Sequence, residues 1–266
     1  MTSVRSVPWI ALLEACCAQS TITCLDIIID QAGSDTPMLG SVLSVEPSLP
    51  WHSLFSELPE AGAEELAPLL VRVDLAVPLQ RQWLIGLMQN LKGHSQLLVL
   101  ASNWPFQALA EYLGRCLEAQ SGGYPGLLRY YDPRLFPLLF SHVLEPNQQR
   151  LLLRPAVFWS WLDRDGLPQR LAGACDEPVW PEERRPIVLS DSQLETLGCA
   201  SDATLALTNL GEALPPQLSA EQQFQTCYAA MLEATQAGLI LATEREAHAL
   251  DRLRTACASH PSKARK

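Results

Sequence analysis

The sequence is poor in basic residues and contains no long apolar run. Its 19 Lys and Arg residues are outnumbered by 29 Asp and Glu residues, which gives a formal net charge of -10. A negatively charged chain repels phosphate backbones, so nucleic acid is not an expected partner. The longest apolar runs are only as long as a strand, and Met1 to Pro8 lacks the pattern of a secretory signal. We therefore expect a cytoplasmic protein with no membrane partner.

The sequence also lacks the motifs that mark common catalytic and cofactor sites. It contains no glycine-rich phosphate loop, no GxSxG nucleophile motif and no HExxH zinc motif. The 8 cysteines include no CxxC pair, so we interpret them as small, reduced apolar residues. None of the 5 histidines stands at a telling spacing from a nucleophile. We expect no catalytic residue, no cofactor and no metal, although a triad assembled only in three dimensions stays open.

Helical and strand patterns alternate over the first part of the chain. Apolar residues at helical spacing predict helices over 7–18, 81–91 and 106–118. Short apolar runs predict strands over 25–29, 69–75, 97–101, 127–131 and 153–162, with a further short strand near 42–45. This alternation is typical of a mixed α/β lobe, which we place at residues 1–166.

The composition changes after residue 166. Residues 167–188 contain four prolines and scattered charges, which predicts a linker or a segment that runs along the surface. Ser190 with Gln193, Ser219 with Gln222, and Thr243 with Glu246 each fit a capping box at a helix start. We therefore predict an α+β protein whose mixed α/β N-terminal lobe is followed by a small all-helical lobe at 189–260 and a solvated tail at 261–266.

Residues 128–134 read Leu-Arg-Tyr-Tyr-Asp-Pro-Arg, and we call them the signature segment. Asp132 and Pro133 are typical of a helix start, because Asp accepts hydrogen bonds from free amides and Pro has no amide to leave unpaired. We therefore predict a helix that begins at Pro133. Arg129 and Arg134 are suited to pair with Asp132 or with another buried carboxylate, which would lock the preceding strand to this helix.

The signature segment closely resembles the hallmark Arg-aromatic-Tyr-Asp-Pro-Arg motif of the type VI secretion effector adaptors, also called effector chaperones. The leucine-rich stretch at 135–143 and the Trp-ending strand before Asp163 to Gly166 also resemble that family. The main resemblance covers residues 25–166, with mild departures such as Gln31 in place of the usual Gly.

This resemblance implies a binding protein without a cofactor. Such adaptors hold a toxic effector in the producing cell and load it onto the VgrG spike, so the expected partners are a secreted effector and a VgrG protein. Either the signature segment has only a structural role, or Arg129, Tyr131 or Arg134 contacts one of these partners. Two other functions stay open, a cytoplasmic immunity protein that blocks a toxin and a hydrolase built on the α/β lobe.

Overall fold

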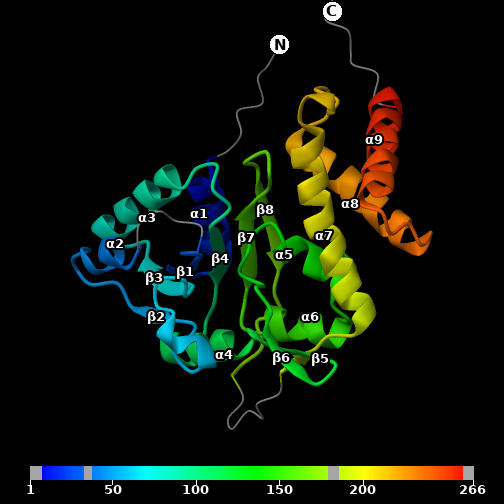
Figure 1. The fold of residues 1–266 in the computed structure, drawn as a ribbon. Helices are drawn as coiled ribbons and strands as arrows, with labels where there is room; N and C mark the ends of the chain where they lie inside the picture. Colours follow the sequence, from blue (N-terminus) through cyan, green and yellow to red (C-terminus); the bar gives the residue numbers. More distant parts are fainter. Residues whose placement is uncertain (1–7, 33–37, 179–185, 260–266) are drawn as a thin grey trace, which may run out of the picture. The chain divides into compact units, whose positions relative to one another are not determined.

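The structure is a computed structural model that describes residues 8–32, 38–178 and 186–259 (Figure 1). The chain divides into two compact units, Met1–Leu189 and Ser190–Lys266, which we call the α/β unit and the helical unit. The first holds the sheets and the second is built of helices, so the α+β prediction is confirmed. No helix within the described ranges is long and apolar enough to cross a membrane.

The main sheet of the α/β unit has six strands in the order β2-β3-β1-β4-β7-β8, and every neighbouring pair is antiparallel. These strands are β1 (Cys24–Ile29), β2 (Trp51–Ser53), β3 (Leu69–Asp74), β4 (Leu97–Ala101), β7 (Phe158–Leu162) and β8 (Pro168–Ala172). The central strands β1 and β4 are buried on both faces, which explains why their residues are apolar except for Asp26 of β1.

Helices cover both faces of this sheet. On one face, α1 (Trp9–Gln19), the short α2 (Leu39–Leu43) and α3 (Pro78–Asn90) pack over a core that includes Ile27, Val71 and Val99. Away from these helices lie α4 (Phe106–Arg115), α5 (Phe136–Leu138) and α6 (Pro146–Leu153) (Figure 1). A 3-10 turn (Pro59–Gly62) precedes β3, and a π-helix (Leu139–Val143) continues α5. Phe136 contacts Trp159 of β7, with ring centroids 5.0 Å apart.

A second sheet corrects the predicted elements before the signature segment. Its order is β6-β5-β9, with β5 (Glu118–Ser121), β6 (Tyr124–Leu127) and β9 (Ile187–Val188). Gly122 and Gly123 both have positive φ values, 56° and 84°, which suits the tight turn between β5 and β6. The helix predicted over 106–118 therefore ends at Arg115, and the strand predicted over 127–131 is wrong because the paired residues are 124–127.

Three other predictions are corrected. Residues 39–43 form α2, where a short strand was expected near 42–45, and the predicted strand over 153–162 begins only at Phe158 because α6 continues to Leu153. Residues 167–188 do not form a simple linker. They contribute β8 to the main sheet and β9 to the second sheet, so the α/β unit extends to Leu189.

The helical unit consists of α7 (Asp191–Leu210), a 3-10 turn (Gly211–Ala213), α8 (Ala220–Gln236) and α9 (Ala242–Ser259). The capping boxes at Ser190 and Ser219 are confirmed, because each serine side chain accepts a hydrogen bond from the backbone N–H of its glutamine partner. The third is wrong, since α9 already begins at Ala242. The predicted tail at 261–266 lies outside the described residues.

Candidate partner-binding site

The signature segment follows β6 and is fixed by its backbone and by Tyr130. The backbone N–H of Leu128 donates to the carbonyl of Leu117 at 2.8 Å, and the Asp132 N–H donates to the Arg129 carbonyl at 3.1 Å. Tyr130 is fully buried, and its hydroxyl donates to the Leu113 carbonyl at 2.9 Å. These bonds hold the arginines on either side of Tyr130 in defined positions.

Asp132 holds Arg134 through three hydrogen bonds. Its Oδ1 accepts from the backbone N–H and the Nε of Arg134, both at 2.9 Å, and its Oδ2 accepts from Nη2 at 2.7 Å. The Asp132 carbonyl accepts from the N–H groups of Leu135 and Phe136. The Asp132 side chain thus stabilises a turn, and the prediction that it caps a helix is wrong, because Leu135 is the N-cap residue of α5 and no side chain caps that helix. The helix itself begins at Phe136 and not at Pro133, because residues 133–135 form a turn.

Arg129 pairs with a carboxylate that lies far away in the sequence. Its Nη2 donates to Asp30 Oδ2 at 2.8 Å, and its guanidinium lies over the Tyr131 ring at 5.5 Å. Asp30 directly follows β1, and its backbone N–H and carbonyl are both bonded to Gln96. The expected pairing of both arginines with buried carboxylates is thus present, and Asp30 is the partner that the sequence analysis did not name.

The four charged residues form one electrostatic cluster, which we call the arginine cluster (Asp30, Arg129, Asp132 and Arg134). The hydrogen bonds and charge of Asp132 raise the pKa of Arg134. Burial acts to lower the pKa of Arg129, but Tyr131, Asp30 and Asp132 outweigh it and the pKa is raised. Both guanidinium groups therefore stay charged at every physiological pH.

The cluster presents its cations to the solvent and hides its anions. The side chains of Arg129 and Arg134 are 44% and 53% exposed, whereas those of Asp30 and Asp132 are each 5% exposed. Within the described part of the chain, Nη1 of Arg134 has no hydrogen-bond acceptor. Tyr131 is buried, and the Arg129 guanidinium lies over its ring, so its contact with a partner stays a prediction.

A small cavity of about 70 Å³ lies beside the cluster. It is lined by Pro133 and by residues such as Trp9, His94, Leu162 and Arg164. Arg164 Nη2 also approaches the Arg134 carbonyl at 3.4 Å. The cavity is smaller than the pockets that hold most small-molecule ligands. The exposed guanidinium groups are therefore the better candidate for a binding surface at this site.

The structure contains two serine–histidine contacts that the sequence analysis did not predict. Ser56 Oγ lies 2.8 Å from His52 Nε2, and Ser141 Oγ lies 2.6 Å from His142 Nδ1. Ser141 Oγ also lies 3.0 Å from the Pro137 carbonyl, so this hydroxyl has a backbone acceptor as well as the imidazole. No carboxylate of the described residues contacts His52, so the orienting third member of a triad is missing there.

The described residues contain no group of three or more His, Cys, Asp or Glu side chains arranged to hold a metal ion. The most deeply buried charge is Asp26 of β1, which forms a two-pronged ion pair with Arg72 of β3 at 2.7 and 2.8 Å. Arg72 also donates to the Trp104 carbonyl and lies over Phe106, so it ties the sheet to α4. Both charges lie inside the fold, which gives this pair a structural role.

The comparison with protein families identifies a similar family. The model of a family described as a domain of unknown function (DUF4123) matches residues 27–151, a stretch that includes Asp30 and the whole signature segment. That family is associated with type VI secretion effector adaptors. No curated protein and no solved structure matches the chain.

Proposed function

We propose that this protein is a type VI secretion adaptor that binds a toxic effector in the cytoplasm and loads it onto a VgrG spike. The matching family supports this type of function, and the arginine cluster lies within the matched residues. The proposed role is a binding role: the protein acts through contact with two folded proteins and without a reaction of its own.

The observation that carries the proposal is the fixed position of two exposed guanidinium groups. Arg loses much side-chain entropy when it is ordered at an interface, and that cost is smaller when the side chain is already held. Asp30 and Asp132 hold Arg129 and Arg134 from beneath while a large part of each guanidinium faces solvent. The remaining N–H groups are suited to a carboxylate on a partner surface.

The overall charge makes these arginines selective. The chain carries a formal net charge of -10, so the chain as a whole repels an acidic partner. A carboxylate-rich patch on the effector or on the spike is therefore attracted only where cations are exposed. Arg129 and Arg134 form such a place, and we infer that one of the two partners docks on them.

Deleting the gene in the producing bacterium tests this function. We expect export of one effector to stop while the spike and tube proteins still reach the medium, which immunoblots of the culture supernatant measure. Loss of all secretion, or unchanged export of every effector, would contradict the adaptor function. Unchanged export combined with self-intoxication of the deletion strain would instead support an immunity protein.

A further inference from the structure

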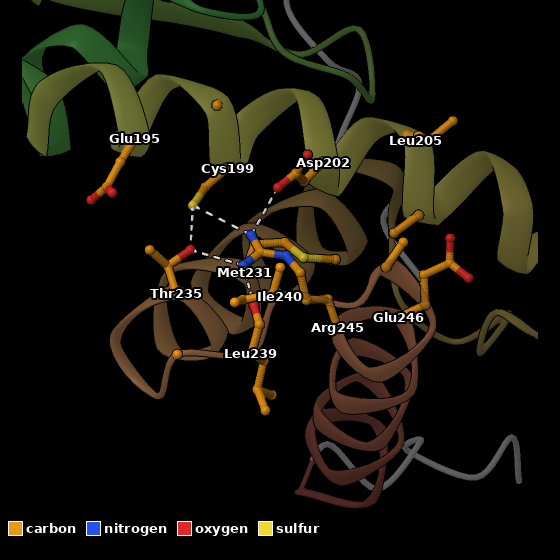
Figure 2. A pocket seen from close by; sticks show the side chains of 14 residues that line it. Glu195, Cys199, Asp202, Leu205, Met231, Thr235, Leu239, Ile240, Arg245 and Glu246 are labelled. Carbon is orange, nitrogen blue, oxygen red and sulfur yellow. Dashed lines mark hydrogen bonds and ion pairs between the residues drawn. The ribbon is translucent and has the colours of Figure 1, made fainter. Parts of the chain in front are cut away.

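The helical unit contains a groove that the arginine cluster does not explain (Figure 2). Its volume is about 510 Å³, and it lies between α7, the end of α8 and the connection into α9. Glu195, Asp202 and Leu205 of α7 lie along one side, and Ile240, Arg245 and Glu246 lie along the other (Figure 2). We call this feature the helical groove.

Arg245 forms a fixed floor for the helical groove. Its Nη1 donates to Thr235 Oγ1 at 3.0 Å and to the Leu239 carbonyl at 3.2 Å, and its Nη2 donates to Asp202 Oδ2 at 2.8 Å. Only 13% of the Arg245 side chain is exposed. One residue of α9 thus ties together α7, α8 and the connection between α8 and α9, so the groove is part of the folded unit.

The rim of the groove exposes large apolar side chains to water. Ile240 is 88% exposed, and Leu205 on the opposite side is 59% exposed. Leu241, the next residue in the connection, is also exposed. Single exposed leucines are ordinary, but apolar side chains grouped on the two sides of one groove are typical of a binding surface.

Gly198 leaves part of the α7 side of the groove without a side chain. It lies in the middle of α7 and lines the groove, and a Cβ added at this position would meet no atom within 4 Å. Glycine weakens a helix interior relative to alanine, and no packing contact of the described residues requires it here. A missing side chain at this point lets another backbone approach α7 closely.

The shape and charge of the groove indicate the ligand. The α7 residues that line it, Glu195, Gly198, Asp202 and Leu205, recur every three or four positions and mark a straight strip about 15 Å long. Asp202 already matches the charge of Arg245, so the carboxylates of Glu195 and Glu246 leave the rim negative. A short helix with an apolar face and flanking Lys or Arg residues complements this strip.

We propose that the helical groove binds an amphipathic, basic helix of the secreted effector. This inference rests on the proposed adaptor function and adds the binding surface and the chemistry of the bound segment. The apolar face of that helix packs between Leu205 and Ile240, its backbone crosses α7 at Gly198, and its basic residues pair with Glu195 and Glu246.

The first test uses a synthetic helical peptide of about 18 residues that carries Leu on one face and Lys on the flanks. Fluorescence polarisation with the full chain should show binding at least about tenfold tighter than for the same peptide with Glu in place of Lys. The Gly198→Trp variant, which fills the groove, should lose this preference. Gly86→Trp is the matched control, because a Cβ at Gly86 of α3 also meets no atom within 4 Å.

Ile240→Asp serves as a second variant that keeps the test decisive if Gly198→Trp folds poorly, since Ile240 is almost fully exposed. It should also weaken binding of the Lys peptide by at least about tenfold. Equal binding by wild type and both groove variants would overturn the inference, as would a preference for the Glu peptide.

Co-purification with the effector separates this inference from the adaptor function. If wild type retains the effector and both groove variants lose it, the two proposals stand together. If wild type and both groove variants retain the effector equally, the groove inference fails and the adaptor function stands. If wild type retains neither effector nor spike but still binds the Lys peptide through Gly198, the adaptor function fails and the groove remains a site for basic helices.

Discussion

The α/β unit and the helical unit place their acidic side chains differently. In the α/β unit, Asp26, Asp30 and Asp132 are each nearly inaccessible and each holds an arginine. In the helical unit, the paired carboxylates of Asp202 and Glu233 are 50% and 42% exposed. A buried carboxylate is hidden from a partner protein, whereas an exposed carboxylate is accessible to water and to other charges.

This difference indicates a division of work. In the proposed function, the α/β unit holds Arg129 and Arg134 in a fixed position for one partner, and the helical unit offers an apolar groove with acidic side chains on its rim. The difference is also measurable unit by unit, because all 7 tryptophans of the chain lie in residues 1–189 and none lies in the helical unit. Tryptophan fluorescence therefore reports on the α/β unit alone.

Arg72→Met is expected to have the largest effect and would break the α/β unit selectively. The side chain of Asp26 is fully buried, so this substitution leaves a buried carboxylate without its partner at neutral pH. We expect the free energy of unfolding of this unit to fall by about 3 kcal/mol in denaturant titrations followed by tryptophan fluorescence. The double variant Asp26→Leu with Arg72→Met should recover most of this loss. Equal losses in the single and double variants would contradict a buried ion pair.

The pH dependence of the same unit gives a smaller effect. Burial raises the pKa of Asp26 to about 6, although the hydrogen bonds and charge of Arg72 lower it. Because the unfolded chain has a lower pKa, about 3.9, the fold binds this proton more tightly. The stabilisation is complete below about pH 4 and is lost as the pH rises through about 6.

Relative to the double variant, wild type should therefore lose on the order of 2 kcal/mol of unfolding free energy between pH 4 and pH 7. The same fluorescence titrations, repeated across this range, measure the difference. A difference that stays constant with pH would show that Asp26 keeps an ordinary pKa in the fold.

Substitutions of two glycines test the helical unit separately from the α/β unit, and they have the smallest expected effects. Gly198→Ala should raise the free energy of unfolding of the helical unit by about 1 kcal/mol, because alanine strengthens α7 and its Cβ meets no atom. Thermal unfolding followed by far-UV circular dichroism should show this as a higher midpoint. Gly238→Ala should lower stability by a similar amount, about 1 kcal/mol, because Gly238 has a φ of +71°. Unfolding followed by tryptophan fluorescence should be unchanged in both variants. If both variants changed the thermal midpoint in the same direction, the helical conformation of Gly198 or the positive φ of Gly238 would be contradicted.

The parts of the fold that could be predicted are those that depend on neighbouring residues. The apolar run of β1 and the capping boxes at Ser190 and Ser219 each specify their own structure, because the partners lie within a few positions. The conformation around the signature segment could not be predicted in this way. Leu127 to Tyr131 has a strand-like composition, but the turn at Gly122 and Gly123 pairs β5 with residues 124–127 instead.

The candidate site was predictable only in part for the same physical reason. The pairing of Asp132 with Arg134 is local and follows from the sequence of the signature segment. Arg129 pairs with Asp30 across 99 positions, and only the fold brings them together. The helical groove depends on the packing of α7, α8 and α9, whose lining residues lie up to about 50 positions apart in the sequence, so no local pattern predicts it.

The central claim is that Arg129 and Arg134 are held in position to bind a partner. The most direct measurement is co-purification of the effector and the spike with a variant that carries both Arg129→Lys and Arg134→Lys. Lysine keeps the positive charge beside Asp30 and Asp132, but it lacks the planar guanidinium that can bind a partner carboxylate through two parallel hydrogen bonds. We predict unchanged tryptophan fluorescence and at least about tenfold weaker binding of one partner. The control is Arg81→Lys, because Arg81 forms an exposed ion pair with Glu14 away from the arginine cluster, and this variant should bind both partners as wild type does. A folded double variant that binds both partners as tightly as wild type would contradict the claim.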